Sequence, residues 1–294
     1  MSPSSPAPAP SATTTIVTCI EAGFMERQVP LLVKSLRRFD HVLARAQVLA
    51  IQPRKGPAIS GATRRELKTL GIEHVRADLV GSYAWYNNLN KSAAMAWADR
   101  NCTTDFITWL DADMVFLGPT PEVVPGLDTS FVARAGEGYL GSDGADRNAP
   151  YWERISQIVG VDYKAAEIIE SLPEGRPIYE YYQSGVYSQA RRDGIGIRHL
   201  EFMKKVLDAA VGSIVARNYH YDQVTISMAA APGAACASGW PGRTITTSIR
   251  SRSRRSIARC CAVAGCCIIT AGSTRRPGAG SRPCSTRSTP RAAS

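Results

Sequence analysis

The chain has 294 residues and a formal net charge of +10, from 35 Lys and Arg against 25 Asp and Glu. Residues 231–294 contain eleven Arg and no Lys, Asp or Glu, so residues 1–230 hold the other 24 bases against all 25 acids. The body is therefore not a basic protein. The last 64 residues also lack Leu, Phe, Tyr and Met, which excludes an ordinary hydrophobic core there.

The composition divides the chain into three parts. Residues 1–13 are rich in Pro, Ala and Ser and are expected to be disordered, residues 14–230 suffice for one α/β domain, and residues 231–294 form an Arg- and Cys-rich low-complexity tail. No apolar run approaches the ~20 residues of a membrane span, and no cationic and apolar leader opens the chain, so we expect a cytoplasmic protein. Cys19 and Cys102 provide no disulfide framework, and the tail has neither the His nor the paired CxxC spacing of a zinc site.

Hydrophobic periodicity predicts strands alternating with helices, which is typical of a largely parallel sheet. Ser60 is a candidate N-cap, and Gly71 is expected to end the helix that Ser60 begins. The expected strands span residues 14–20, 47–51, 73–76, 105–110 and 183–187. The expected helices span residues 29–39, 60–70, 91–100, 151–159, 164–172, a segment around 200–207, and 223–230.

Two carboxylates follow the clearest buried strand expected in the chain. Asp111 and Asp113 come directly after residues 105–110, and ligands of open parallel sheets collect where strands end. Paired carboxylates there suit a hard divalent cation that leaves positions for phosphate oxygens. The alternative is that Asp111 caps the next turn while Asp113 is solvated.

Four spaced segments resemble GT-A-fold glycosyltransferases, in particular family 8-like enzymes. The strand ending in Trp109 and Leu110, followed by Asp-Ala-Asp, resembles their D-x-D segment. The three other segments, at 85–91, 183–187 and 222–223, resemble the aromatic and Asn-Lys segment, the Asn-x-Gly-Val segment and the Asp-Gln pair of that family. The resemblance covers residues 14–230 and implies a GT-A-type, Rossmann-like sheet that transfers a sugar from a nucleotide-diphosphate donor.

The resemblance also implies roles for individual residues. A UDP-sugar would bind with Mn²⁺ or Mg²⁺ held by Asp111 and Asp113, the cation neutralising the departing diphosphate. Asp222 would bind sugar hydroxyls or act as a base and Gln223 would face the reacting carbon, although an acid there could simply favour the start of a helix. The expected donor-binding residues are Thr18, Cys19, Ile20, Lys91, Asp111, Gln183, Ser184 and Gly185.

Several of these positions have ordinary structural alternatives. Lys91 could be a solvated lysine in the first turn of a helix, and residues 18–20 could be strand core. Trp85 and Tyr86 could stack on a sugar or base or belong to the core, and His220 could be a ligand or a structural side chain. Gln183 stands where the family usually has Asn. The acceptor is not indicated.

The composition of residues 231–294 is typical of GC-rich DNA translated out of frame. Read from the third base of each codon, residues 265–270 become Leu-Leu-His-His-His with GC-rich third positions, and family 8-like enzymes carry a metal-binding His near the C-terminus. A frameshift near Ala230 would remove that ligand, so activity of this chain is in question.

Two other functions remain open: a nucleotidyltransferase, although a Gly-rich loop after the first strand is missing, and an RNA-associated protein using its Arg-rich tail. Nucleic-acid binding is the weaker interpretation.

Overall fold

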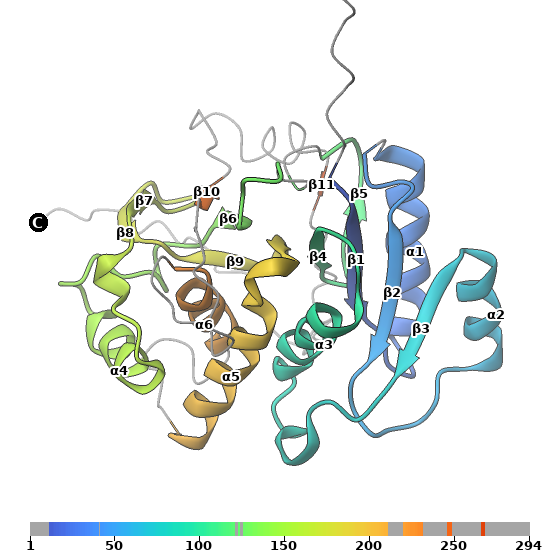
Figure 1. Ribbon diagram of the computed structural model, residues 1–294, viewed down its shortest axis with the longest axis horizontal. Helices are drawn as coiled ribbons and strands as arrows, with labels where there is room; N and C mark the ends of the chain where they lie inside the picture. The colour runs from blue at the N-terminus through green and yellow to red at the C-terminus, as the bar shows by residue number, and fades with distance from the viewer. Residues whose placement is uncertain are drawn as a thin grey trace, which may run out of the picture.

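The computed structural model describes residues 12–40, 42–120, 123, 126–210 and 220–231, together with two short strands in the tail. The central sheet is mixed and mostly parallel, with strand order β10-β6-β9-β4-β1-β2-β3 (Figure 1). Its strands are β1 (Thr14–Cys19), β2 (Gln47–Gln52), β3 (Ile72–Arg76), β4 (Phe106–Leu110), β6 (Phe131–Ala135), β9 (Tyr182–Ala190) and β10 (Thr246–Ser248). Strands β1 to β4 are mutually parallel, and β9 runs antiparallel to both β4 and β6.

Helices cover both faces of this sheet (Figure 1). They are α1 (Met25–Phe39), α2 (Gly61–Thr69), α3 (Leu89–Asn101), α4 (Ala149–Val159), α5 (Ile195–Asp208) and α6 (Tyr221–Ala230). Leu49 and Ile51 of β2 contribute to the core cluster with α3 to α6, while Val48 and Ala50 pack in the second cluster with α1 and α2. Alternate residues of β2 therefore pack into two hydrophobic cores, one on each face of the sheet. The prediction of an α/β domain with a mostly parallel, helix-flanked sheet is confirmed.

Local signals placed the two ends of α2 where they were expected. The Ser60 hydroxyl accepts the backbone N–H of Thr63 at 3.1 Å, so Ser60 caps α2. Gly71 follows α2 with φ of +59°, a conformation that costs glycine little.

The predicted helix at residues 164–172 is wrong. Only one 3₁₀ turn forms, Tyr163–Ala165, begun by the Asp162 side chain. The chain then enters β7 (Ile168–Glu170), which pairs with β8 (Pro177–Tyr179). Ile169 is buried between exposed neighbours, which is the alternation of a strand. This alternation is too short to recognise in the sequence, so the apparent helical spacing was misleading.

Three other strands were not predicted: β5 (Val115–Phe116), β6 and β8. In the tail, β10 pairs with β6, and β11 (Cys266–Cys267) pairs with β5. These two strands, Thr13, which donates to Asp105 Oδ2 at 2.9 Å, and the buried Ala231 contradict the disorder expected at their positions. The rest of that prediction, apart from residue 12, falls on residues outside those that the structure describes. None of the described helices is long and apolar enough to cross a membrane.

Candidate active site

Asp111 and Asp113 lie in the turn that follows β4, at the carboxyl edge of the parallel strands. The backbone N–H of Asp111 donates to the Gly185 carbonyl at 2.9 Å, so the β4–β9 pairing continues to this point. The Trp109 indole N–H donates to Asp111 Oδ1 at 2.7 Å. Asp111 is therefore held by its own strand and by the neighbouring one, while Asp113 is half-buried.

Gly185 gives the Asp111 carboxylate its space. A Cβ on Gly185 would lie 3.2 Å from Asp111 Oδ2, which is closer than most real contacts of this kind. Glycine at this position lets the backbone of β9 approach the carboxylate.

Lys91 of α3 lies at the centre of the site rather than in solvent. Its ammonium donates to the Ser184 carbonyl at 2.8 Å and to the Ser184 hydroxyl at 2.9 Å. It also lies 3.2 Å from Asp111 Oδ1 and 3.4 Å from Asp222 Oδ2. The Lys91 side chain is only 11% exposed, so it is a buried cation shared by two carboxylates.

Burial and charge act in opposite directions on these groups. Burial lowers the pKa of Lys91, but the carboxylates of Asp111 and Asp222 more than offset it, so that the pKa is raised above its ordinary value. Burial raises the pKa of Asp111, and the Lys91 ammonium opposes this rise. The lysine is charged at neutral pH and stabilises the ionised form of Asp111.

Asp222 reaches the same cluster from the first turn of α6. Its Oδ2 accepts the Ser184 hydroxyl at 2.7 Å, while its Oδ1 is buried without a hydrogen-bond partner. Asp222 lies in the first turn of α6, where an acid is also favoured electrostatically, and its described side-chain contacts go to Ser184 and Lys91. Asp222 thereby connects α6 to β9 and α3.

His199 of α5 supports Asp222 from behind, and sequence patterns gave no sign of it. Its Nε2 lies 3.0 Å from the Asp222 carbonyl oxygen, and the imidazole is fully buried. Burial lowers the pKa of His199 to about 4, so the ring is neutral at pH 7.

The rim of the site is formed by two amide side chains with partners. Gln183 donates its amide to Glu137 Oε1, and the Tyr181 hydroxyl donates to Gln223 Oε1. His220 Nδ1 lies 3.4 Å from the Gln223 amide nitrogen, which is its only described side-chain contact in the site.

Glu137, which was not predicted, is held by the loop after β6. A Cβ on Gly136 would lie 2.3 Å from the Tyr181 ring, and one on Gly138 would lie 2.7 Å from the Ser171 hydroxyl. Packing therefore fixes the backbone on both sides of Glu137. Its Oε2 is buried and has no hydrogen-bond partner. A carboxylate between two glycines in a Gly-rich stretch was the available signal.

The expected residues at the end of β1 point in different directions. Cys19 donates its thiol to the Asn90 carbonyl at 3.7 Å, next to Lys91, and burial raises the pKa of that thiol. Thr18 is buried, and its hydroxyl has no hydrogen-bond partner. Ile20 packs in the core on the α1 side. Of these three residues, Cys19 borders the lysine and carboxylate cluster.

An ion pair beside this strand end was also missed. Arg54 Nε donates to Glu21 Oε1 at 2.7 Å, and the same oxygen accepts the Asn90 amide at 3.2 Å. Trp85, in the loop before α3, is 66% exposed, whereas Tyr86 is buried with its ring 5.9 Å from that of Tyr221. Tyr86 therefore belongs to the core, and Trp85 has a free face.

Within the described ranges, no three His, Cys, Asp or Glu side chains gather in a way that would hold a metal ion. The site instead combines two adjacent carboxylates, one buried cation and a rim of amides. This arrangement offers charge for a polyanion and hydrogen bonds for hydroxyl groups.

Comparison with known proteins agrees with this chemistry. No curated protein sequence matches the chain. A family model described as the Rhodobacterales glycosyltransferase domain matches residues 16–232, which include every site residue described above. The chain therefore belongs to the Rhodobacterales glycosyltransferase domain family, and it is a transferase of sugars.

Proposed function

We propose that the chain transfers the sugar of a nucleotide-diphosphate donor, a UDP-sugar, to an acceptor at the carboxyl edge of its sheet. The observation that carries the proposal is the convergence on Lys91 of Asp111, Ser184 and Asp222, which come from separate elements. The mostly parallel sheet with an Asp-Ala-Asp turn at its edge supports a GT-A-type, family 8-like assignment.

The residues at this edge fit a divalent cation that is shared with substrate. Asp113 forms no ion pair with a described side chain, and Asp111 Oδ2 is free of the tryptophan and lysine contacts, which both fall on Oδ1. Mg²⁺ or Mn²⁺ commonly takes one or two protein carboxylates and completes its shell with phosphate oxygens and water. When bound, such an ion stabilises the charge that develops on a departing diphosphate.

The chain's own side chains would divide the remaining work. Lys91 would hold the carboxylates of Asp111 and Asp222 in place, and it would add a positive charge that attracts the pyrophosphate. Gln183, Gln223 and Glu137 would hydrogen-bond the hydroxyls of the sugar at the rim. The side chain of Asp222 is only 6% exposed, which keeps it from direct contact with a substrate. It would therefore act by orienting Ser184 and the start of α6.

Donor binding tests this proposal directly. Asp113→Asn keeps the shape of the side chain and removes its charge, so the Mn²⁺-dependent affinity for UDP-glucose, measured by calorimetry, should fall at least tenfold. Asp111→Asn should cost less, because Lys91 already neutralises much of that carboxylate. Asp128→Asn, at an exposed position, is the matched control. Unchanged Mn²⁺-dependent affinity in the Asp113 variant would contradict the metal-dependent mechanism.

We also propose that residues 231–294 are read out of frame and that the shift removes part of the site. The family match stops at residue 232, at the start of a tail that contains no Lys, Leu, Asp or Glu. In addition, Cys267 pairs with Val115, two residues beyond Asp113. Within residues 265–270 the alternative frame encodes its first His at the junction of codons 267 and 268, so this pairing is compatible with a His ligand beside the carboxylates.

Two variants distinguish this idea from a genuine Arg-rich domain. Deleting residues 232–294 should leave the thermal unfolding temperature unchanged, because out-of-frame residues have no selected core contacts. Restoring the alternative frame should raise stability and increase Mn²⁺-dependent hydrolysis or transfer of UDP-sugar. Loss of folding on deletion, with no gain from the restored frame, would refute the frameshift. Sequencing the gene across codons 225–240 provides an independent check.

A further inference from the structure

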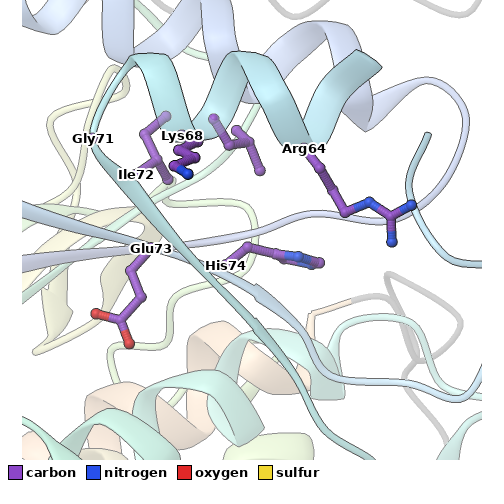
Figure 2. A pocket seen from close by; sticks show the side chains of 7 residues that line it. Arg64, Lys68, Gly71, Ile72, Glu73 and His74 are labelled. Carbon is purple, nitrogen blue, oxygen red and sulfur yellow. The ribbon is translucent and has the colours of Figure 1, made fainter. Parts of the chain in front are cut away.

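A cavity of about 440 Å³ lies far from the lysine and carboxylate cluster, between α2 and β3. Strand β3 is an edge of the central sheet. The lining residues are Arg64, Leu67, Lys68, Gly71, Ile72, Glu73 and His74. Leu67 and Ile72 belong to the core and form its apolar floor. Figure 2 shows Lys68 beside Ile72 under α2, with Arg64 and His74 toward the other end of the cavity.

The cations here lack partners of opposite charge. Arg64 and Lys68, from successive turns of α2, form no ion pair with a described carboxylate. Arg37 of α1 adds a further positive charge, with its Nη2 3.9 Å from where a Cβ on Gly71 would lie. Unpaired arginines brought together at one opening leave a local positive potential that an anion would relieve.

The single acid that lines the cavity does not supply this balance. Glu73 pairs in register with Leu49, whose side chain packs in the core on the α3 side, and Glu73 Oε2 accepts the Gln47 amide at 3.1 Å. Its carboxylate is therefore directed away from α2, as Figure 2 also shows.

His74 shows the effect of the surrounding charge. Burial lowers the pKa of its imidazole, and the nearby cations Arg64 and Arg76 lower it further. Its Nε2 is buried and has no hydrogen-bond partner. A buried ring nitrogen without a hydrogen-bond partner, beside cations without a counter-ion, is an incomplete arrangement.

We propose that this cavity, lined by Arg64, Lys68 and His74, binds the phosphate group of a phosphorylated ligand. A phosphate group accepts several hydrogen bonds at once, and its oxygens match the forked N–H groups of an arginine. It can therefore contact three separate cations more fully than a carboxylate, which has only two oxygens. The apolar floor of Leu67 and Ile72 would cover the carbon part of a phosphomonoester. The same chemistry occurs in a soluble metabolite and in a lipid headgroup. The inference does not depend on the proposed sugar transfer.

Titration of His74 in the full chain tests the site. Bringing an anion next to His74 should raise its pKa by about half a unit to one unit, measured by NMR in inorganic phosphate or glycerol 3-phosphate against chloride at equal ionic strength. The His74→Gln variant assigns the signal. The double change R64Q and K68Q should abolish the phosphate effect, whereas Arg65→Gln, which removes an exposed charge from the same helix, should preserve it.

Vesicles containing phosphatidylglycerol separate the two sources of phosphate. A response to soluble phosphate alone identifies a soluble ligand, while co-sedimentation with vesicles that is lost in the Arg64 and Lys68 variant identifies a lipid headgroup. No response to either probe, or an equal loss in Arg65→Gln, would overturn the site. Neither outcome affects the Asp113 experiment, so the two proposals stand or fall separately.

Discussion

Replacing Lys91 by Met should be the most destabilising single change in the site. Met fills a similar volume without charge, so the carboxylates of Asp111 and Asp222 would lose their shared cation. Removing one partner of a buried ion pair costs about 3–5 kcal/mol. Asp222, with 6% of its side chain exposed, should account for most of the loss, and Asp111, at 36%, for less. A loss of this size lowers the unfolding temperature by roughly 6–20 °C for a domain of about 200 residues.

The effect should depend on pH with a definite sign. Asp111 has a raised pKa in the folded protein, and losing Lys91 should raise it further. A carboxyl group whose folded pKa exceeds its unfolded value binds its proton more tightly when folded, so lowering the pH stabilises the fold. The deficit of Lys91→Met relative to the wild type should therefore shrink between pH 7 and pH 5.

Urea unfolding followed by circular dichroism measures both quantities. The matched control is Lys34→Met, which removes a surface pair with Glu66 at 2.6 Å and should cost less than about 1 kcal/mol. A deficit for Lys91→Met no larger than that of the control, or one that grows on acidification, would refute the assignment of Lys91 as a buried counter-ion.

Three further changes test the packing around the site. Gly185→Ala should move the Asp111 carboxylate and weaken Mn²⁺-dependent binding of UDP-glucose several-fold in calorimetry, with little change in unfolding temperature, since the new methyl lies 3.2 Å from Asp111 Oδ2. Burial raises the pKa of Asp99 to about 7, so the stability of the wild type should increase as the pH falls from 8 to 5. In urea titrations Asp99→Asn should lack that gain, and parallel pH curves for the two proteins would contradict this account. Gly196→Ala should cost about 1–3 kcal/mol by overpacking, because its Cβ would lie 2.8 Å from Asp99 Oδ2 and 2.9 Å from the Met95 backbone; wild-type stability in the same urea assay would show that α3 and α5 can separate without cost.

Several elements followed from local chemistry alone. The segment at residues 105–110 is mostly apolar, and β4 is buried throughout. Ser60 and Gly71 bound α2 because a side-chain acceptor and a left-handed backbone are properties of single residues. The edge position of Asp111 and Asp113 followed from their place after a parallel strand.

Other features depended on distant partners. The strand β6 was missed because its pairing with β9 involves residues 47 to 58 positions away. Ile169 takes its place in the core within a strand that pairs with β8. Glu137 acquires its place in the site through Gln183 and the packing of Tyr181 against Gly136. No local pattern encodes such contacts, since they arise when the sheet forms.

Lys91 shows most clearly where the two kinds of information separate. From the sequence, a lysine in the first turn of a helix is as compatible with solvent as with a site, because its immediate neighbours are the same in both cases. The sequence by itself determined the α/β alternation, the carboxylate pair and the change of composition near residue 231. Tertiary structure decided that β9 and α6 bring Ser184 and Asp222 to Lys91. The physical reason is that burial and charge pairing are properties of the assembled chain, and both set the energy of an ionised side chain.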